Sequence, residues 1–275
     1  MDNRPIGIFD SGLGGLTVLN AVHRLLPKEQ LVYFGDSGRA PYGTKSKETI
    51  IKYTYQDINF LLSKGVKMIV IACNTASACS LESVRRGYSI PIVEVVGPGA
   101  QAAARATKTG HIGVIGTPAT IGSGVYERAI KKLLPNCQCS KKACPLFVPL
   151  VEEGWWDHEV SQLVAEEYLK DLKSAELDSL VLGCTHYPLL TAVIQKVMGD
   201  QVTLINSAKE VALAVKDSLM KLDMCRDPEL LSGAGEMKFY TSDSVDKFAS
   251  LGSVFLNMPI DAVKKVEIEK ERDRP

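Results

Sequence analysis

The chain repeats one order of short apolar segments, and this repetition restricts its fold more than any other feature. Ile6–Ser11 resembles Ile112–Thr117, and Met68–Thr75 resembles Ser179–His186. The strands expected within these segments are Ile6–Phe9, Met68–Ala72, Ile112–Ile115 and Leu180–Gly183. These stretches are apolar throughout, which is typical of strands covered on both faces of a parallel sheet. All α/β proteins contain such strands, but a shared order in both halves favours a duplicated unit.

Helical patterns separate these strands. Three further strands are expected at Leu31–Phe34, Phe147–Val151 and Val202–Ile205. Apolar residues recur at helical spacing between the strands, as in Gly15–Leu26, Glu48–Ser63 and Ser161–Lys173. This alternation predicts an α/β fold with two pseudo-symmetric domains, each a mostly parallel sheet flanked by helices, and an active site at their interface. Within the repeat, we pair Leu31–Asp36 with Phe147–Glu152, so that both second strands end in an acid.

The length of 275 residues is enough for two domains. Gly97-Pro98-Gly99 is typical of a crossover, and the helical stretch Ser207–Leu222 follows the last strong strand of the second half. We therefore expect residues 1–96 and 208–275 to form the first domain and residues 97–207 the second.

Composition excludes several classes of function. Lys plus Arg and Asp plus Glu each number 32, so the zero net charge indicates neither nucleic-acid binding nor an anionic membrane surface. The amino-terminal segment lacks the apolar run of a signal peptide, and no stretch is apolar over the length of a bilayer. Seven cysteines without a regular framework favour reduced thiols and a cytoplasmic location.

Polar residues follow the predicted strands, where ligands bind in open parallel sheets. The positions are Asp10-Ser11, Asp36, Cys73-Asn74-Thr75, Glu152 and Cys184-Thr185-His186.

Cys73 and Cys184 occupy equivalent places in the two halves. Asn74 and Thr75 are suited to begin a helix, whose free N–H groups favour an anion, so we expect a lowered thiol pKa. A single cysteine of this kind is usually a buried structural residue. Two at matching positions of a repeat favour a chemical role.

Paired thiols can have four roles here, which the sequence supports to different degrees. A disulfide is disfavoured because no C-x-x-C unit is present. A Cys/His hydrolase would place His186 only two residues from Cys184 and leave Cys73 unexplained. The loop cluster of Cys137, Cys139 and Cys144 lacks the spacing of zinc ligands, so no metal site is predicted. Two thiols flanking a carbon fit racemisation best, because one can remove the α-proton while the other returns a proton to the opposite face.

Four motifs, in order along the chain, resemble those of glutamate racemases. They are Asp10-Ser11-Gly12-Leu13-Gly14-Gly15, Pro41-Tyr42-Gly43, Ala72-Cys73-Asn74-Thr75-Ala76 and Gly183-Cys184-Thr185-His186-Tyr187-Pro188. The resemblance runs from about Ile6 to about Leu251. It implies interconversion of L- and D-glutamate without pyridoxal phosphate or a metal, supply of D-glutamate for peptidoglycan, and a homodimer.

The resemblance also implies residue roles. Cys73 is expected to act on D-glutamate and Cys184 on L-glutamate, with Asp10, Glu152 and His186 supporting the thiols. The residues implied to contact substrate are Asp10, Ser11, Pro41, Tyr42, Gly43, Asn74, Thr75, Thr185 and His186.

Two alternatives stay open from the sequence. Aspartate differs from glutamate by one methylene, which a pocket distinguishes by only about 1–3 kcal/mol, so an aspartate racemase is the nearest rival. The other alternative is a binding protein whose two lobes close on an amino acid and catalyse no reaction. It would still bind after either cysteine is replaced by serine.

Overall fold

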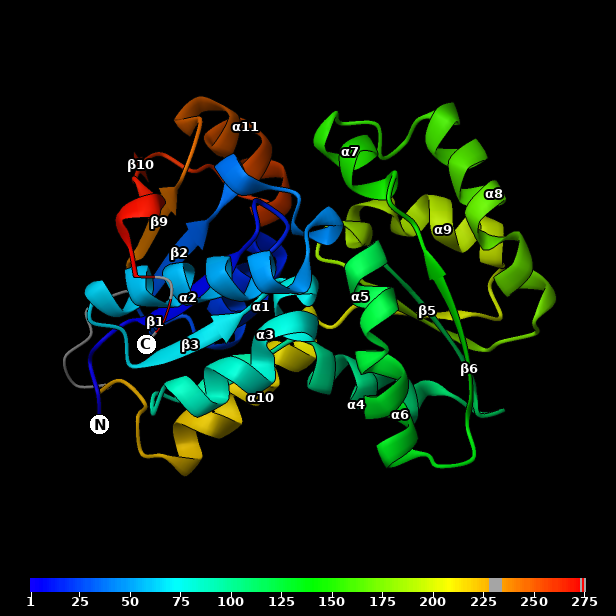
Figure 1. Ribbon diagram of the computed structural model, residues 1–275, viewed down its shortest axis with the longest axis horizontal. Coiled ribbons are helices and arrows are strands. Elements are labelled where there is room, and N and C mark those ends of the chain that lie inside the picture. Colours follow the sequence, from blue (N-terminus) through cyan, green and yellow to red (C-terminus); the bar gives the residue numbers. More distant parts are fainter. Residues whose placement is uncertain (228–233, 273, 275) are drawn as a thin grey trace.

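Two parallel sheets stand side by side in the computed structural model, which describes residues 1–227, 234–272 and 274 (Figure 1). Within that part, the first sheet has the order β10-β9-β2-β1-β3-β4 and the second the order β6-β5-β7-β8. The first comprises β1 (Ile6–Asp10), β2 (Leu31–Gly35), β3 (Met68–Ile71), β4 (Ile92–Glu94), β9 (Met237–Thr241) and β10 (Val263–Lys265). The second comprises β5 (His111–Gly116), β6 (Gln138–Ala143), β7 (Ser179–Gly183) and β8 (Thr203–Ile205).

The strand order makes the internal repeat visible. The run β2-β1-β3-β4 in one sheet corresponds to β6-β5-β7-β8 in the other, and every recorded pairing is parallel. Two mostly parallel sheets flanked by helices confirm the expected α/β fold. Because the strands of each sheet point the same way, their carboxyl ends gather at one edge.

The helices cover both faces of the sheets. We call the first sheet and its helices the first lobe, and the second sheet and its helices the second lobe. Helices and 3-10 turns of the first lobe are α1 (Leu16–Leu25), η1 (Ser37–Arg39), η2 (Tyr42–Thr44), α2 (Lys47–Ser63), α3 (Asn74–Gly87), α10 (Ala208–Lys221), α11 (Val245–Leu256) and η5 (Ile268–Lys270). Those of the second are α4 (Val96–Ala106), α5 (Pro118–Ser123), α6 (Val125–Leu133), α7 (Phe147–Glu152), α8 (Glu159–Ser174), η3 (Tyr187–Leu190) and α9 (Thr191–Met198).

Alternate residues of the first sheet enter two separate cores. Ile6 and Ile8 of β1 belong to the cluster that contains residues of α1 and α11, whereas Phe9 belongs to the cluster that contains residues of α2 and α3. Strand β1 is therefore buried on both faces, which explains why its sequence is apolar up to Asp10. The first of these clusters continues into the second lobe, so apolar packing also joins the two lobes.

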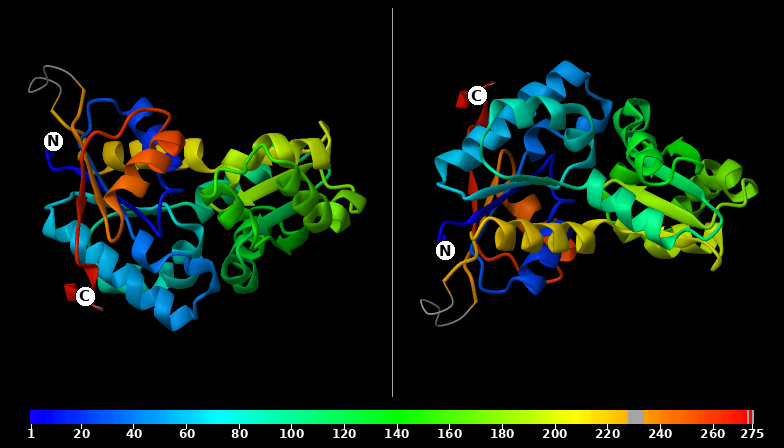
Figure 2. Two further views of the ribbon diagram at one scale, coloured as in Figure 1. Left: turned by 90° about the horizontal axis from the view of Figure 1, so that it is seen from above. Right: turned by 90° about the horizontal axis from the view of Figure 1, so that it is seen from below.

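The chain passes between the lobes twice. It enters the second lobe between β4 and α4 and returns between β8 and α10, and α4 contacts α10 (Figures 1 and 2). Across the described residues, no helix is both long enough and apolar enough to span a membrane.

The predicted strand Phe147–Val151 is wrong, because these residues form helix α7. Pro149 lies in the first turn of this helix, where a missing N–H leaves no hydrogen bond unmade, whereas it would interrupt a central strand. The second strand of the repeat is instead β6, an edge strand that includes Cys139. Its residues are exposed or half-buried, so it carries no apolar signal. The pairing of Leu31–Asp36 with Phe147–Glu152 is therefore also wrong, and Cys139 is not a loop residue.

A buried lysine ties the amino terminus to the first sheet. The Lys67 ammonium lies 2.7 Å from the Glu29 carboxylate and donates at 2.7 Å to the carbonyls of Asp2 and Met224. All three of its donor positions are used. Removing the ammonium would leave a buried carboxylate unpaired, so we expect Lys67→Met to lower the free energy of unfolding by about 3–5 kcal/mol in urea denaturation. The exposed control Lys216→Met should change it by less than about 0.5 kcal/mol. Equal effects would contradict this assignment.

Candidate active site

A small cavity lies between the lobes, at the edge where the parallel strands end. The first lobe contributes Ser11, Gly12, Ala40, Pro41, Tyr42, Gly43, Cys73, Asn74 and Thr75, and the second lobe contributes Thr117, Val148, Glu152, Cys184, Thr185 and His186. Every site residue expected from the sequence lines this cavity except Asp10, which is fully buried behind it. One cysteine from each lobe faces the shared space.

Cys73 begins helix α3 at the end of β3. Its sulfur accepts a hydrogen bond from the Ala76 N–H at 3.4 Å and lies 3.5 Å from the Ser11 hydroxyl oxygen. Burial raises the pKa of the Cys73 thiol, and the nearby Asp10 carboxylate raises it further. The predicted lowering is therefore wrong for this residue, because burial outweighs the helix N–H groups. Both effects favour the neutral thiol at Cys73.

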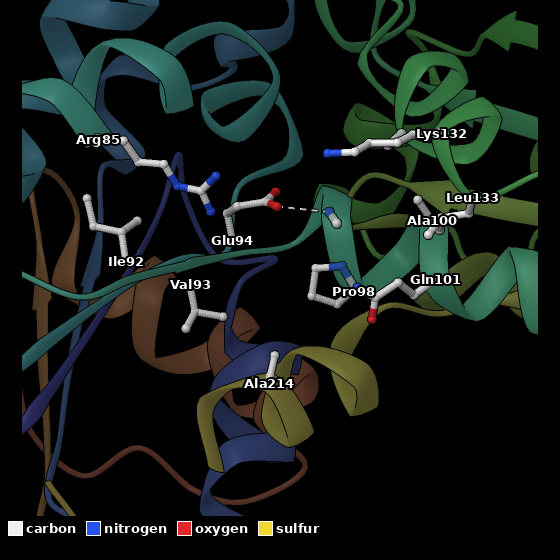
Figure 3. A pocket seen from close by; sticks show the side chains of 12 residues that line it. Arg85, Ile92, Val93, Glu94, Pro98, Ala100, Gln101, Lys132, Leu133 and Ala214 are labelled. Atoms are coloured by element: carbon white, nitrogen blue, oxygen red, sulfur yellow. Dashed lines mark hydrogen bonds between the residues drawn. The ribbon is translucent and has the colours of Figure 1, made fainter. Parts of the chain in front are cut away.

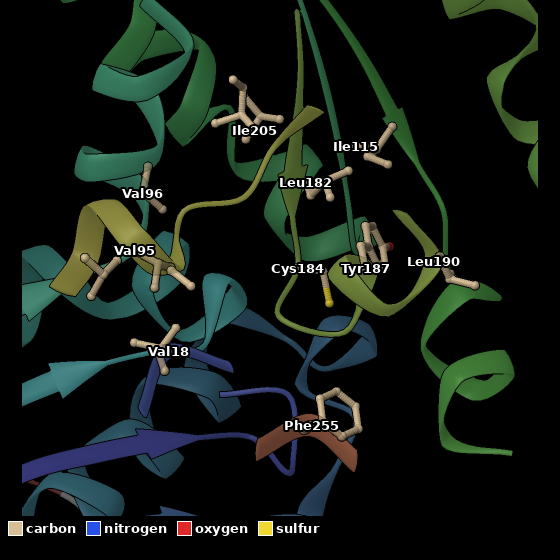
Figure 4. Packing of buried hydrophobic residues seen from close by; sticks show 14 of the residues in the cluster. Val18, Val95, Val96, Ile115, Leu182, Cys184, Tyr187, Leu190, Ile205 and Phe255 are labelled. Atoms are coloured by element: carbon tan, nitrogen blue, oxygen red, sulfur yellow. The ribbon is translucent and has the colours of Figure 1, made fainter. Parts of the chain in front are cut away.

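Cys184 ends β7 and is followed by the 3-10 turn η3. Its side chain points from the apolar packing of the second lobe toward the first lobe (Figure 4). The sulfur lies 3.9 Å from Nδ1 of His186, whose Nε2 lies 3.3 Å from a Glu152 oxygen. Burial lowers the pKa of His186, but its hydrogen bonds with Cys184 and Glu152 outweigh this and raise the pKa to about 10. An imidazolium at this position stabilises a negative charge on the Cys184 sulfur.

Glu152 connects this side of the site to the first lobe. Its hydrogen bond with His186 lowers the Glu152 pKa, although burial opposes the shift. Its second oxygen lies 3.9 Å from the ammonium of Lys247 in α11. Charged side chains thus run from Lys247 through Glu152 to His186, beside the Cys184 sulfur, and they cross from one lobe to the other.

Asp10 supports the site from behind. One carboxylate oxygen accepts from the Gly12 N–H at 3.0 Å and the other from the Thr185 hydroxyl at 3.2 Å, across the boundary between the lobes. Burial raises the pKa of Asp10, and the nearby His186 opposes this shift. Asp10 therefore contacts both halves of the site without lining the cavity.

Several residues of this site were missed in the sequence. The Thr75 and Thr117 hydroxyl oxygens lie 2.9 Å apart, and Tyr126 donates to Asn74 at 2.5 Å, so the second lobe holds both residues that follow Cys73. Thr117 follows β5 as Ser11 follows β1, and this position in the repeat was a usable signal. Lys247 begins a helix remote in sequence, and no motif marks it.

Gly14 lets the two lobes touch. A Cβ atom at Gly14 would lie 2.3 Å from Oγ1 of Thr185 and 2.7 Å from Nδ1 of His186. We expect Gly14→Ala to push the lobes apart and lower kcat/KM by up to about 100-fold, because a displacement near 1 Å suffices for such a loss. Gly122→Ala, where no atom lies within 4 Å of the added methyl group, is the matched control. Unchanged kinetics in Gly14→Ala would refute the contact.

A second hollow lies where the chain first crosses between the lobes, away from the thiols (Figure 3). Arg85, Glu94 and Lys132 contribute its charged side chains. The Glu94 carboxylate accepts from the N–H groups of Val96 and Gly97, at 2.6 and 2.9 Å, and so begins α4. We attribute this hollow to the joint between the lobes.

Two parallel α/β lobes that close on a small polar cavity, each with a cysteine at a strand end, define a two-lobed α/β enzyme. The model of the Asp/Glu/Hydantoin racemase family matches residues 6–215. A glutamate racemase of Geobacter metallireducens is 47% identical over 270 residues, which are 98% of this chain and 99% of the relative. The chain belongs to the Asp/Glu/Hydantoin racemase family.

Solved structures agree with this assignment. A glutamate racemase isoform from Bacillus anthracis superposes with a TM-score of 0.91 at 37% identity, covering 97% of this chain and 98% of the other. The Francisella tularensis glutamate racemase in complex with D-glutamate gives a TM-score of 0.90 at 37% identity, covering 98% and 99%. The resemblance expected from the four motifs is confirmed.

Proposed function

We propose that this protein interconverts L- and D-glutamate by two-base proton transfer between Cys73 and Cys184. The observation that carries the proposal is the single cavity lined by both thiols, one from each lobe. Relatives of nearly the same length are glutamate racemases, and one similar structure holds D-glutamate.

The surroundings of the thiols support a direction for each. His186 provides positive charge beside Cys184, whereas Asp10 provides negative charge near Cys73. Turnover of L-glutamate requires the form of the enzyme with a thiolate at Cys184 and a thiol at Cys73. In this form Cys184 removes the α-proton of L-glutamate and Cys73 delivers a proton to the opposite face. D-glutamate uses the reverse protonation state, in which Cys73 is the base.

The carbanion that forms at the α-carbon needs stabilisation through the adjacent carboxylate. Thr75 and Thr185 line the cavity, and their hydroxyl groups are hydrogen-bonded to Thr117 and Asp10. The Ser11 hydroxyl group and the backbone N–H groups of Gly43 and Asn74 are donors from other residues that line it. We assign them to the substrate carboxylates, because preorganised donors in a site without bulk water stabilise developing charge strongly. Asp10, Glu152 and His186 hold the thiols in place and set their charge.

The remaining parts of the proposal concern the protein as a whole. Proton transfer by two thiols requires neither pyridoxal phosphate nor a metal. Its product would supply D-glutamate for peptidoglycan in the cytoplasm, and we propose a homodimer. We divide the chain into one domain of residues 1–96 and 208–275 and a second of residues 97–207, so that the active site lies between them.

Optical measurements test the substrate directly. Purified protein should bring the circular dichroism of either glutamate enantiomer to zero without added cofactor, and it should act much more slowly on L- and D-aspartate. Turnover of aspartate but not glutamate would contradict the proposed substrate and indicate an aspartate racemase. Binding of glutamate with no change in optical activity would refute racemisation altogether.

A further inference from the structure

A buried polar cluster lies beneath the loop that carries η1 and η2. The Tyr42 hydroxyl stands between two carboxyl groups, with a short hydrogen bond to Asp36 and a separation of 2.9 Å from Oδ2 of Asp57. Arg39 donates to Asp36 at 2.6 Å and to Asp57 at 3.0 Å. Asp36 and Asp57 are fully buried, and Tyr42 is nearly so.

This arrangement fixes a proton count. A tyrosine hydroxyl has one proton, and an ionised carboxylate can only accept hydrogen bonds. Tyr42 therefore cannot satisfy both carboxyl groups if both are ionised. One of them must carry a proton and donate it to the Tyr42 oxygen. With one proton present, the remaining carboxylate balances the single positive charge of Arg39, and the buried cluster is neutral.

The contacts identify which carboxyl group is ionised. Asp36 receives the Arg39 Nε–H, the Tyr42 hydroxyl and, at 2.8 Å, the Ser242 hydroxyl. Three donors favour the charged form. Among the described residues, Asp57 receives one other donor, Arg39, on its Oδ1, so its Oδ2 is the oxygen that can hold a proton facing Tyr42.

We propose that Asp57 is protonated at neutral pH and donates to Tyr42, which in turn donates to the Asp36 carboxylate. The electrostatics agree with this order. Burial raises the Asp57 pKa well above its usual range, the charges of Asp36 and Asp10 raise it further, and Arg39 opposes the rise. Tyr53, on the same helix as Asp57, covers the Arg39 guanidinium, with 4.0 Å from its carbon to the ring centre.

This hydrogen-bonded cluster holds the loop of Pro41, Tyr42 and Gly43 against the second lobe. Pro41, Tyr42 and Gly43 line the active-site cavity, and a Cβ atom at Gly43 would lie 2.5 Å from Cβ of Thr117. The Tyr42 hydroxyl group is held by Asp57 of α2, so this contact fixes the position of a residue that lines the cavity. Asp57 is thus a positioning residue, and its effect on glutamate turnover rests on the function proposed above.

Infrared difference spectroscopy tests the protonation without reference to activity. The spectrum of wild type minus Asp57→Asn at neutral pH should contain the carbonyl band of a protonated carboxylic acid, above the amide bands. In the spectrum of Ser242→Ala minus the double variant Ser242→Ala/Asp57→Asn, the band should remain, because Ser242 donates to Asp36 and accepts from the Gly38 N–H but does not contact Asp57. Absence of the band from the wild-type difference spectrum would overturn the proposal, whatever the protein catalyses.

The KM values of two Asp57 variants distinguish a positioning role for Asp57 from a general role in folding. Asparagine can donate to Tyr42 and accept from Arg39, so Asp57→Asn should keep KM for glutamate within about threefold, the size of one modest hydrogen bond. Asp57→Ala removes the donor to the Tyr42 oxygen and the acceptor of one Arg39 N–H, so its KM should rise by about tenfold or more while circular dichroism shows a folded protein. Equal KM values in the two variants would remove the positioning role. If the wild type lacked racemase activity, the function proposal would fail and the infrared result would still decide the protonation.

Discussion

Replacing either Cys73 or Cys184 with serine is expected to lower kcat/KM by about 10²–10⁴-fold in both directions, the usual contribution of a positioned acid or base. Each direction uses one sulfur to remove a proton and the other to return one, so neither variant retains a one-way activity. A serine hydroxyl fits the space but is a far weaker acid than a thiol. Loss of circular dichroism from each glutamate enantiomer measures the rate.

Cys79 provides the control for the cysteine substitutions. It lies on helix α3, which Cys73 begins, but is half-buried outside the cavity. Cys79→Ser should keep the wild-type rate. Near-normal turnover in either Cys73→Ser or Cys184→Ser would contradict the two-base mechanism, because a single thiol would then be enough to remove and return the α-proton.

The second large effect concerns His186. We expect His186→Asn to lower kcat/KM by about 10²–10³-fold, because it removes the positive charge beside the Cys184 sulfur. In the wild type, His186 stays protonated at neutral pH and loses its proton as the pH rises through about 10. The imidazolium charge beside the Cys184 sulfur is then lost, so activity should fall on that alkaline limb.

A charge change at Glu152 tests the origin of this limb. Glu152→Gln removes the negative charge from the hydrogen bond that raises the His186 pKa, so the alkaline limb should move to lower pH. His186→Asn should lack the limb. Initial rates from neutral pH to above pH 10 provide the comparison. An alkaline limb at the same pH in wild type, Glu152→Gln and His186→Asn would show that another group causes it.

The strands were predictable where burial on both faces requires apolar residues along the whole strand. Strands β1, β3, β5 and β7 are central and covered on both faces, so each is a continuous apolar run. Edge strand β6 lacks that constraint and was missed, and the buried residues of α7 were mistaken for it. Periodicity alone does not separate a short buried helix from a buried strand. Pro149 was the available sign of the difference.

The site was predictable to the extent that it depends on strand ends and motifs. Cys73 and Cys184 end equivalent strands, and the structure brings both to one cavity. Glu152 also reaches the cavity, but from the end of helix α7 and not from the strand end that the sequence suggested. The charge state of Cys73 was not predictable, because it depends on how deeply the folded lobes bury the sulfur.

Contacts made only by folding stayed hidden. Lys247 approaches Glu152, and Thr117 approaches Thr75, across the boundary between the lobes. The Asp57 carboxyl comes from a helix pattern in which a charged residue is expected to face solvent, yet it is fully buried beside Tyr42. A single sequence contains the residues of such networks but not their proximity.

Proton exchange in deuterium oxide tests the central claim most directly. With L-glutamate as substrate and no added pyridoxal phosphate, the D-glutamate formed first should carry deuterium at its α-carbon, because its proton comes from a thiol in exchange with solvent. Unreacted L-glutamate should still carry protium at that stage, and D-glutamate should give the mirror result. Early product that retains the original α-proton, or substrate that exchanges without inversion, would show that one base serves both faces and would contradict the account.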